Sequence, residues 1–192
     1  MSDEPRVQLV HRSGADVATL FERMADVYQQ VYAEPPYLSG PLFSRQRFAE
    51  RTRRQAETEG FGLVAAESDG ELVGFAFGLP FPPGQWWAGE ATPPPPEVLA
   101  ATKFAVIELV LLNPFRGRGL GHAMLDELLA KRPEPWAFLT AHPQAPARRL
   151  YERWGWRCIG TAHHAPDSPV FDSLVLPLPG GQSATPPSTH QV

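Results

Sequence analysis

Three glycines at alternating positions, Gly117, Gly119 and Gly121, follow the apolar segment 104–112 and precede the helical pattern 122–131. Glycine lets the backbone turn tightly and approach a ligand closely, and the free N–H groups of a first helical turn attract anions. This order of strand, glycine-rich turn and helix predicts a pyrophosphate site. The alternative is that the glycines serve only the sterics of the turn.

Glu108 is the acidic residue within the apolar segment 104–112. A carboxylate in an otherwise apolar strand must face a cleft, a charged partner or water. We therefore expect Glu108 either at a functional site or in a structural hydrogen bond.

The elements that must position these residues follow from hydrophobic periodicity and turn residues. We expect strands at 7–10, 61–67, 71–79, 104–112, 136–140, 157–162 and 170–176, and helices beginning near residues 13, 44, 122 and 146. Asp69-Gly70 predicts a hairpin turn, and the proline-rich segment 80–96 predicts a long loop. Strands interleaved with helices indicate an α/β or α+β fold, a mixed sheet with helices on both faces.

Composition limits the class of protein. The 192 residues, with 43% hydrophobic and 20% charged residues, indicate one globular domain, which we place at 1–179, followed by a disordered tail at 180–192. We find no apolar run long enough to span a membrane and no signal peptide, which predicts a cytoplasmic protein without a membrane partner. The single cysteine, Cys158, excludes an internal disulfide and is expected to be buried.

Charge and basic residues give weaker indications. The net charge of −4 argues against a nucleic-acid partner. We interpret the local arginine cluster as a solvated helix face; its members are Arg45, Arg47, Arg51, Arg53 and Arg54. His163 and His164 are expected to be exposed.

Two motifs resemble a known family. Residues 107–121 resemble the coenzyme A motif of the GNAT acyltransferase superfamily, with Arg116, Gly119 and Gly121 at its three fixed positions. Residues 147–156 resemble the second signature of that family, with Tyr151 in place and Trp156 where phenylalanine is usual. The resemblance spans roughly residues 6–178 and is strongest over 104–160.

The resemblance implies a fold and an activity. The fold would be a mixed, mostly antiparallel seven-stranded sheet whose fourth and fifth strands splay apart. The activity would be transfer of an acetyl group from acetyl-coenzyme A, as co-substrate and without a metal, to a primary amine of a small molecule or peptide by direct attack. A non-catalytic acyl-coenzyme A-binding or sensing domain is the alternative, and a Rossmann-type nucleotide site is disfavoured because its glycine turn would follow the first strand. A homodimer is left open.

The same resemblance assigns site residues. Residues expected to contact coenzyme A are Leu109, Val110, Leu111, Leu112, Arg116, Gly117, Arg118, Gly119, Leu120, Gly121, His122, Ala123, Gln144, Ala147 and Tyr151. The N–H of Leu111 would stabilise the oxyanion, Tyr151 would be the general acid, and Glu108 would be a general base or substrate anchor, with His142 as the second candidate base. The expected acceptor wall consists of Tyr32, Tyr37, Phe43, Phe77, Trp86, Trp87 and Glu108.

Overall fold

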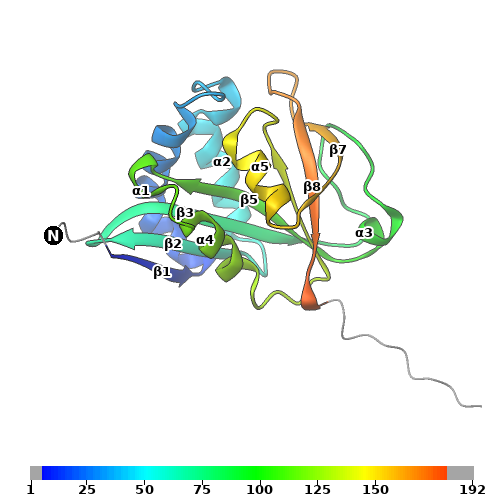
Figure 1. The fold of residues 1–192 in the computed structure, drawn as a ribbon, viewed down its shortest axis with the longest axis horizontal. Helices are drawn as coiled ribbons and strands as arrows, with labels where there is room; N and C mark the ends of the chain where they lie inside the picture. Colours follow the sequence, from blue (N-terminus) through cyan, green and yellow to red (C-terminus); the bar gives the residue numbers. More distant parts are fainter. Residues whose placement is uncertain (1–5, 181–192) are drawn as a thin grey trace, which may run out of the picture.

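The structure, a computed structural model, describes residues 6–180. The predicted tail therefore lies outside the described residues from 181 onward. The described chain forms one sheet with the strand order β1-β2-β3-β5-β6-β8-β7-β4, and helices lie on both of its faces (Figure 1). The predicted mixed α/β fold is confirmed.

The first three strands form an antiparallel meander. β1 (Val7–Arg12) pairs with β2 (Gly62–Ser68), and β2 pairs with β3 (Glu71–Phe81). Asp69 and Gly70, which join β2 to β3, have φ angles of 51° and 82°. These positive values are those of a primed hairpin turn, as the Asp-Gly pair predicts.

One face of this meander is covered by the two N-terminal helices. α1 (Gly14–Tyr32) begins after Ser13, whose backbone N–H donates to the Asp16 carboxylate at 2.7 Å. The one-turn η1 (Pro41–Phe43) leads into α2 (Arg45–Ala56). The two helices share a core with the sheet that is rich in aromatic rings, formed by Phe21, Tyr28, Phe48, Phe75 and Phe77.

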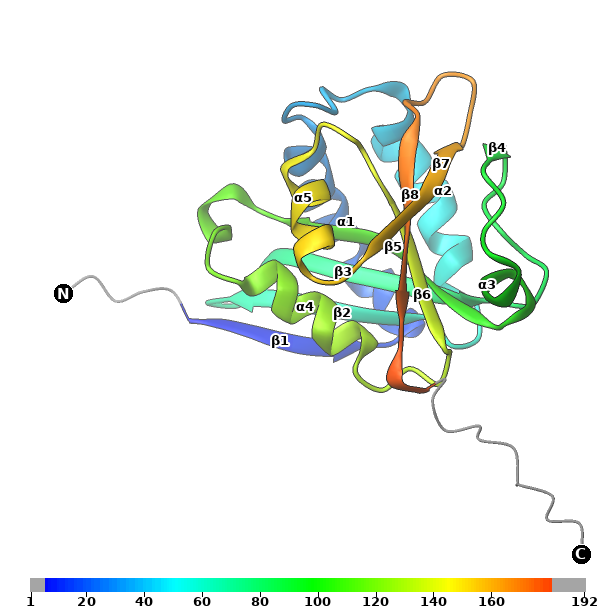
Figure 2. The same ribbon diagram turned by 45° about the vertical axis from the view of Figure 1, so that its right-hand side comes forward.

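The opposite face of the sheet carries two helices. One follows the glycine turn, and the other follows the strand at residues 136–141. α4 (Leu120–Leu129) buries Met124, Leu125 and Leu128 against β2, β3 and β5. α5 (Pro146–Arg153) contributes Tyr151 to the same core. Figure 2 shows α4 and α5 on the near side of the sheet and α1 and α2 behind it.

The sheet opens where its two halves meet. β5 (Lys103–Leu111) pairs with β3 along its length, but it pairs in parallel with β6 (Trp136–Ala141) only over residues 103–105. Beyond that point the two strands diverge, and the splay expected between the fourth and fifth predicted strands is confirmed. On the far side, β6 pairs with β8 (Phe171–Pro177), and β8 pairs with β7 (Arg157–His163).

The expected count of seven strands is low by one. The proline-rich segment contains the two-residue strand β4 (Glu90–Ala91), which pairs with β7, and the short helix α3 (Pro96–Ala100). The buried side chain of Lys103 donates to the carbonyls of Pro82 and Ala101 and so holds this segment against the sheet. The pairing of β4 with β7 joins distant parts of the chain and leaves no local pattern in a segment dominated by proline.

A second expectation fails at Cys158, which is exposed on β7 rather than buried. This strand lies near the edge of the sheet, where one face meets solvent. Within residues 6–180, none of the helices combines the length and apolar character that crossing a bilayer requires.

Candidate active site

The divergence of β5 and β6 leaves a groove that reaches into the sheet. Its cavity of about 60 Å³ lies between the two strands and the start of α5. The groove is lined by Tyr32, Tyr37, Val106, Ile107, Glu108, Leu109, Leu139, Thr140, Ala141, Ala145, Ala147 and Tyr151. This is where the sequence predicts the arm of coenzyme A.

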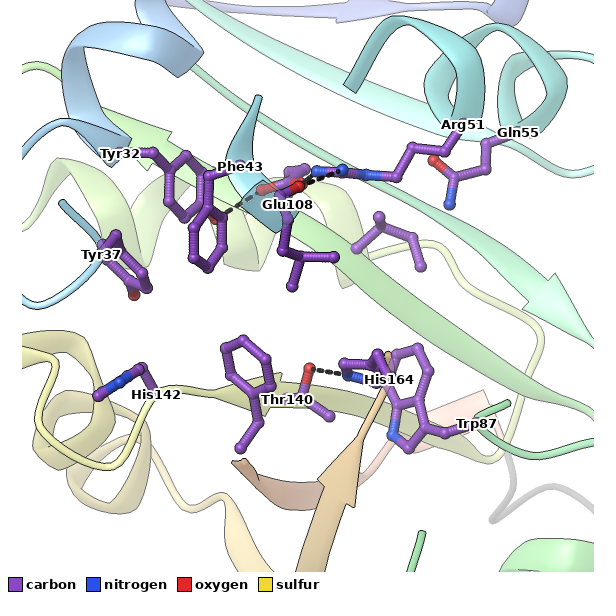
Figure 3. Close-up of a pocket in the computed structure, with 13 residues that line it drawn as sticks. Tyr32, Tyr37, Phe43, Arg51, Gln55, Trp87, Glu108, Thr140, His142 and His164 are labelled. Carbon is purple, nitrogen blue, oxygen red and sulfur yellow. Dashed lines mark hydrogen bonds and ion pairs between the residues drawn. The ribbon is translucent and has the colours of Figure 1, made fainter. Parts of the chain in front are cut away.

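A larger cavity of about 220 Å³ adjoins the groove on the side of α1 and α2. It is lined by Tyr32, Tyr37, Leu42, Phe43, Arg51, Gln55, Trp87, Ile107, Glu108, Thr140, His142, His164 and Phe171. In Figure 3 one wall carries Tyr32, Phe43, Arg51 and Glu108, and the facing wall carries Thr140, His142, His164 and Trp87. The residues that line both cavities mark the junction; they are Tyr32, Tyr37, Ile107, Glu108 and Thr140.

Glu108 is buried at this junction and both of its carboxylate oxygens accept hydrogen bonds. Arg51 Nη2 donates to Oε1 at 2.8 Å, and the Tyr32 hydroxyl donates to Oε2 at 2.7 Å. Burial raises the pKa of Tyr32 well above its ordinary value, and the nearby Glu108 charge adds to the effect. Tyr32 therefore stays protonated and remains a hydrogen-bond donor to the carboxylate.

The expectation that the arginines of α2 form a solvated face is wrong for Arg51. It points inward from α2, where it also donates to the hydroxyl of Tyr28 and the carbonyl of Leu42. Burial opposes its charge, but the adjacent Glu108 carboxylate and the Tyr28 hydroxyl together outweigh burial, and the pKa of Arg51 is raised. The charge pattern of α2 does not single out Arg51 among its arginines. Only the tertiary contact with Glu108 on β5 distinguishes it.

Tyr151 lies on α5 with its ring buried between Trp154 and Trp156, and it lines the groove. Burial raises its pKa, and the neighbouring Tyr37 and Glu108 add to the shift. The phenol is therefore protonated at neutral pH, which is the state that a proton donor needs.

The glycine turn connects the end of β5 to α4. Gly117 and Gly119 have φ angles of 79° and 78°, which other residues rarely adopt. A Cβ atom built on Gly121 would meet nothing within 4 Å. Its φ is not positive, and glycine in a helix costs about 1 kcal/mol relative to alanine. Neither packing nor strain requires glycine at 121, and its absent side chain leaves the backbone at the start of α4 open to approach.

The backbone of β5 also presents donors to the groove. The N–H of Leu112 donates to the Val73 carbonyl at 2.9 Å, and Gly74 is the register partner of Leu111. Because hydrogen-bonded and non-hydrogen-bonded pairs alternate in an antiparallel ladder, the N–H of Leu111 points away from β3 and toward the divergence. This is the orientation that the expected oxyanion contact requires.

The comparisons with known proteins point the same way. Residues 21–156 match the Acetyltransferase (GNAT) family. The chain belongs to this family of acetyltransferases. A GCN5-like protein acetyltransferase of Mycobacterium tuberculosis is 34% identical over 138 residues, which cover 65% of this chain and 67% of that protein.

Solved GNAT structures share the fold of this acetyltransferase. NAA60 of Arabidopsis thaliana, in complex with acetyl-CoA, superposes with a TM-score of 0.59 at 17% identity, covering 88% of this chain and 97% of that one. An aminoglycoside acetyltransferase from an uncultured soil metagenomic sample gives a TM-score of 0.57 at 22% identity, covering 85% of this chain and 99% of that one.

Among the residues of this GNAT domain expected to hold coenzyme A, Arg116 has side-chain partners within the protein. Its guanidinium donates two hydrogen bonds to the Glu34 carboxylate, at 2.6 and 3.1 Å, and one to the Leu111 carbonyl at 2.7 Å. It joins the end of α1 to the end of β5 instead of extending into the turn. The ring of His122 stacks on Trp154 at 4.6 Å.

The remaining expected coenzyme A residues lie around the turn and the groove. Arg118 is exposed in the turn, Gln144 is exposed before α5, and Leu120 and Ala123 form the first turn of α4. Leu109 and Ala147 line the groove. The Val110 side chain lies in the core shared with α1 and α2, Leu112 packs against both cores, and the backbone N–H groups of both residues face β3 and not the groove.

Most of the residues expected to form the acceptor wall line the larger cavity, and two do not. Tyr32, Tyr37, Phe43 and Trp87 line the larger cavity. Phe77 does not, because it is fully buried beneath the site against Phe61 and Phe75. Trp86 does not line the cavity either; it stacks on Phe138 at 4.6 Å and its ring contacts that of Trp87.

Sequence reasoning missed residues on the facing wall. His164 was expected to be exposed, but it lines the cavity, contacts Trp87 and Phe171, and lies 3.1 Å from the Thr140 hydroxyl through Nε2. His163 is half-buried beside it. No local sequence signal marks His164 or Thr140, because the antiparallel register of β6, β8 and β7 brings them together.

Proposed function

We propose that this protein transfers an acetyl group from acetyl-coenzyme A to a primary amine of a small molecule or peptide, by direct attack of the amine on the thioester. The observation that carries the proposal is the junction of two cavities at Glu108 and Thr140. One cavity lies in the strand divergence near the glycine turn, and the other is a separate space for an acceptor. Two substrates that react directly must meet at such a junction.

Coenzyme A binding is supported by the glycine turn and the strand edge. The turn at 116–121 exposes N–H groups at the start of α4, and the space above Gly117, Gly119 and Gly121 is open. The divergent edge of β5 offers backbone groups at Leu109 and Leu111 to an extended arm. A pyrophosphate at the turn would direct that arm toward Tyr151.

Acetyl transfer requires stabilisation of an oxyanion and a proton for the departing sulfur. In this proposal the N–H of Leu111 faces the thioester oxygen; a preorganised donor of this kind contributes about 3 kcal/mol to lowering a barrier. Tyr151 gives its phenolic proton to the sulfur as the C–S bond breaks. Its burial beside the groove supports this role because a phenol with a raised pKa retains its proton until the thiolate forms.

The acceptor cavity favours an amine attached to an apolar or aromatic body. Aromatic rings of Tyr32, Tyr37, Phe43 and Phe171 form its walls. Glu108 is the carboxylate among the described residues that line it, and Arg51 cancels that charge. A polycationic acceptor would gain no surplus negative charge here, so we place amines of peptides and of hydrophobic small molecules ahead of aminoglycosides and polyamines.

The proposal is tested by thiol release from acetyl-coenzyme A with a panel of amines. The panel contains a phenylalkylamine, dipeptides with an aromatic first residue, free lysine, a polyamine and an aminoglycoside. We expect the first two to give saturable thiol release and an acetamide product identified by mass spectrometry. No thiol release with any amine, or no coenzyme A binding by calorimetry, would contradict the proposed function.

A further inference from the structure

The proposed transfer needs a group that removes a proton from the acceptor. An alkylammonium, with a pKa of about 10, has no lone pair with which to attack a thioester. The candidates among the described residues that line the acceptor cavity are Glu108, His142 and His164. Their hydrogen bonds distinguish them.

Glu108 is poorly placed to take a proton from an ammonium. Its two oxygens already accept from Arg51 and Tyr32, and the guanidinium lies 2.8 Å from Oε1. An ammonium that approaches Glu108 therefore also approaches the positive charge of Arg51. The Arg51–Glu108 ion pair therefore adds no net charge to this wall of the cavity.

His142 is also unsuitable in the arrangement that the structure has. The backbone N–H of Gln144 donates to its Nδ1 at 3.1 Å, so Nδ1 carries no proton. The neutral ring then carries its proton on Nε2 and has no second lone pair to offer to the cavity. Burial lowers the pKa of His142, which keeps it in this neutral form.

His164 differs because its Nε2 faces a hydroxyl at the junction. Nε2 lies 3.1 Å from Thr140 Oγ1, and Figure 3 shows this contact on the wall opposite Glu108. The ring has a backbone hydrogen bond with Ala88 that favours its protonated form. Because Nε2 faces Thr140, the proton that bonds to Ala88 belongs on Nδ1, which leaves Nε2 as the acceptor of the Thr140 O–H.

We propose that His164 accepts the proton of the acceptor ammonium through the hydroxyl of Thr140. Thr140 lines both cavities, so its hydroxyl can contact an amine next to the thioester. His164 contacts the same hydroxyl through Nε2. Thr140 is then the catalytic residue, and His164 positions its hydroxyl and holds the proton. The inference rests on the proposed acetyl transfer.

The proton balance is complete with the groups present. The ammonium gives one proton to Thr140 Oγ1 as Thr140 gives its own proton to His164 Nε2. The nitrogen lone pair forms the C–N bond, the C–S bond breaks, and the sulfur takes the proton of Tyr151. The phenolate of Tyr151 takes the second proton of the nitrogen, and the imidazolium of His164 releases its proton to solvent. The products are an acetamide, coenzyme A as a thiol, and one proton.

The surroundings of His164 keep its ring in the neutral form. Burial lowers its pKa from the ordinary value of 6.5, and the nearby charges of His163 and Arg51 lower it further against the effect of Ala88. The other neighbouring rings, Trp87 and Phe171, carry no charge. His164 is therefore neutral at pH 7 and able to take a proton.

The test compares pH profiles of kcat/KM for the wild type, His164→Gln, Thr140→Val and Glu108→Gln, with His11→Gln as a control. His11 is exposed and pairs with Glu127 away from both cavities. With an alkylamine acceptor we expect His164→Gln and Thr140→Val to lose on the order of 10²-fold at pH 7 and to recover toward the wild type as the pH approaches the amine pKa. Coenzyme A affinity, measured by calorimetry, should be unchanged in His164→Gln, because His164 lines only the larger cavity.

Three outcomes would overturn the inference. The first is a wild-type profile for His164→Gln, and the second is a loss that is equal at every pH, which indicates a structural role. The third is alkaline recovery in Glu108→Gln alone, which makes Glu108 the base. An inactive wild type overturns the proposed function as well, whereas an active wild type with any of these three profiles overturns only the role of His164.

Discussion

Arg51 on α2 and Glu108 on β5 form an ion pair at 2.8 Å in one wall of the acceptor cavity. The Glu108 side chain is 4% exposed and that of Arg51 is 24% exposed, so the pair is largely withdrawn from water. Removing one partner of such a pair leaves an uncompensated charge, which costs more than the pair itself contributes.

We predict that Arg51→Gln lowers the free energy of unfolding by about 3 kcal/mol, because it leaves the Glu108 carboxylate buried without a cation. The double variant Arg51→Gln/Glu108→Gln should lose less than the sum of the two single variants. Chemical denaturation measures all three. Arg45→Gln is the control, since Arg45 pairs with the exposed Glu22 and Asp26 and should lose less than about 1 kcal/mol. Additive losses would mean that the pair is not coupled.

Gly119→Glu should abolish coenzyme A binding, because a carboxylate would occupy the space that the phosphates need. Gly84→Glu is the matched control: Gly84 has a φ of 80° against 78° for Gly119, and neither has an atom within 4 Å of a built Cβ. Both variants should therefore lose similar stability, and only Gly119→Glu should lose affinity in calorimetry. Equal affinity in the two would place coenzyme A elsewhere.

Gly121→Ala should separate stability from binding. The backbone there needs no positive φ and a Cβ meets no atom, so alanine should raise helix stability by about 1 kcal/mol or less. Coenzyme A affinity should fall in the same variant, since the methyl group stands between the backbone and the ligand. Thermal unfolding and calorimetry report the two effects, and an unchanged affinity would remove Gly121 from the site.

Tyr151→Phe should lower kcat by on the order of 10²-fold with little change in the Kd for coenzyme A, because only the transition state uses the phenolic proton. The ring would still pack between Trp154 and Trp156. Steady-state thiol release and calorimetry provide the two values. Turnover equal to that of the wild type would leave Tyr151 as a core residue alone.

Stability should fall as the pH drops below about 6.5. Burial lowers the pKa of both His142 and His164 in the folded chain, so below 6.5 the unfolded chain binds more protons at these positions. The free energy of unfolding therefore decreases as the pH falls from the unfolded pKa through the folded values. Urea denaturation between pH 7.5 and pH 5 should show a shallower decrease for His164→Gln than for the wild type. Parallel curves would contradict the buried position of the ring.

Local patterns in the sequence determined most of the elements of this protein and the place of the glycine turn. Asp69-Gly70 specified a hairpin, Ser13 and Asp16 specified a helix start, and the glycines at 117, 119 and 121 specified a turn between strand and helix. Each of these signals acts between residues a few positions apart, so each can be recognised without the fold. Glu108 stood out for the same reason, as a carboxylate in an apolar strand.

The tertiary structure alone decided the partners across the acceptor cavity. Arg51 and Glu108 are 57 positions apart, and Thr140 and His164 are 24 apart, and neither pair follows from periodicity or composition. The same holds for Arg116, which the coenzyme A motif assigned to phosphate and which Glu34 engages from 82 positions away. Burial and hydrogen bonding at these positions depend on which strands pair and which helix covers them, because the charge or exposure of a side chain is set by neighbours that folding brings together.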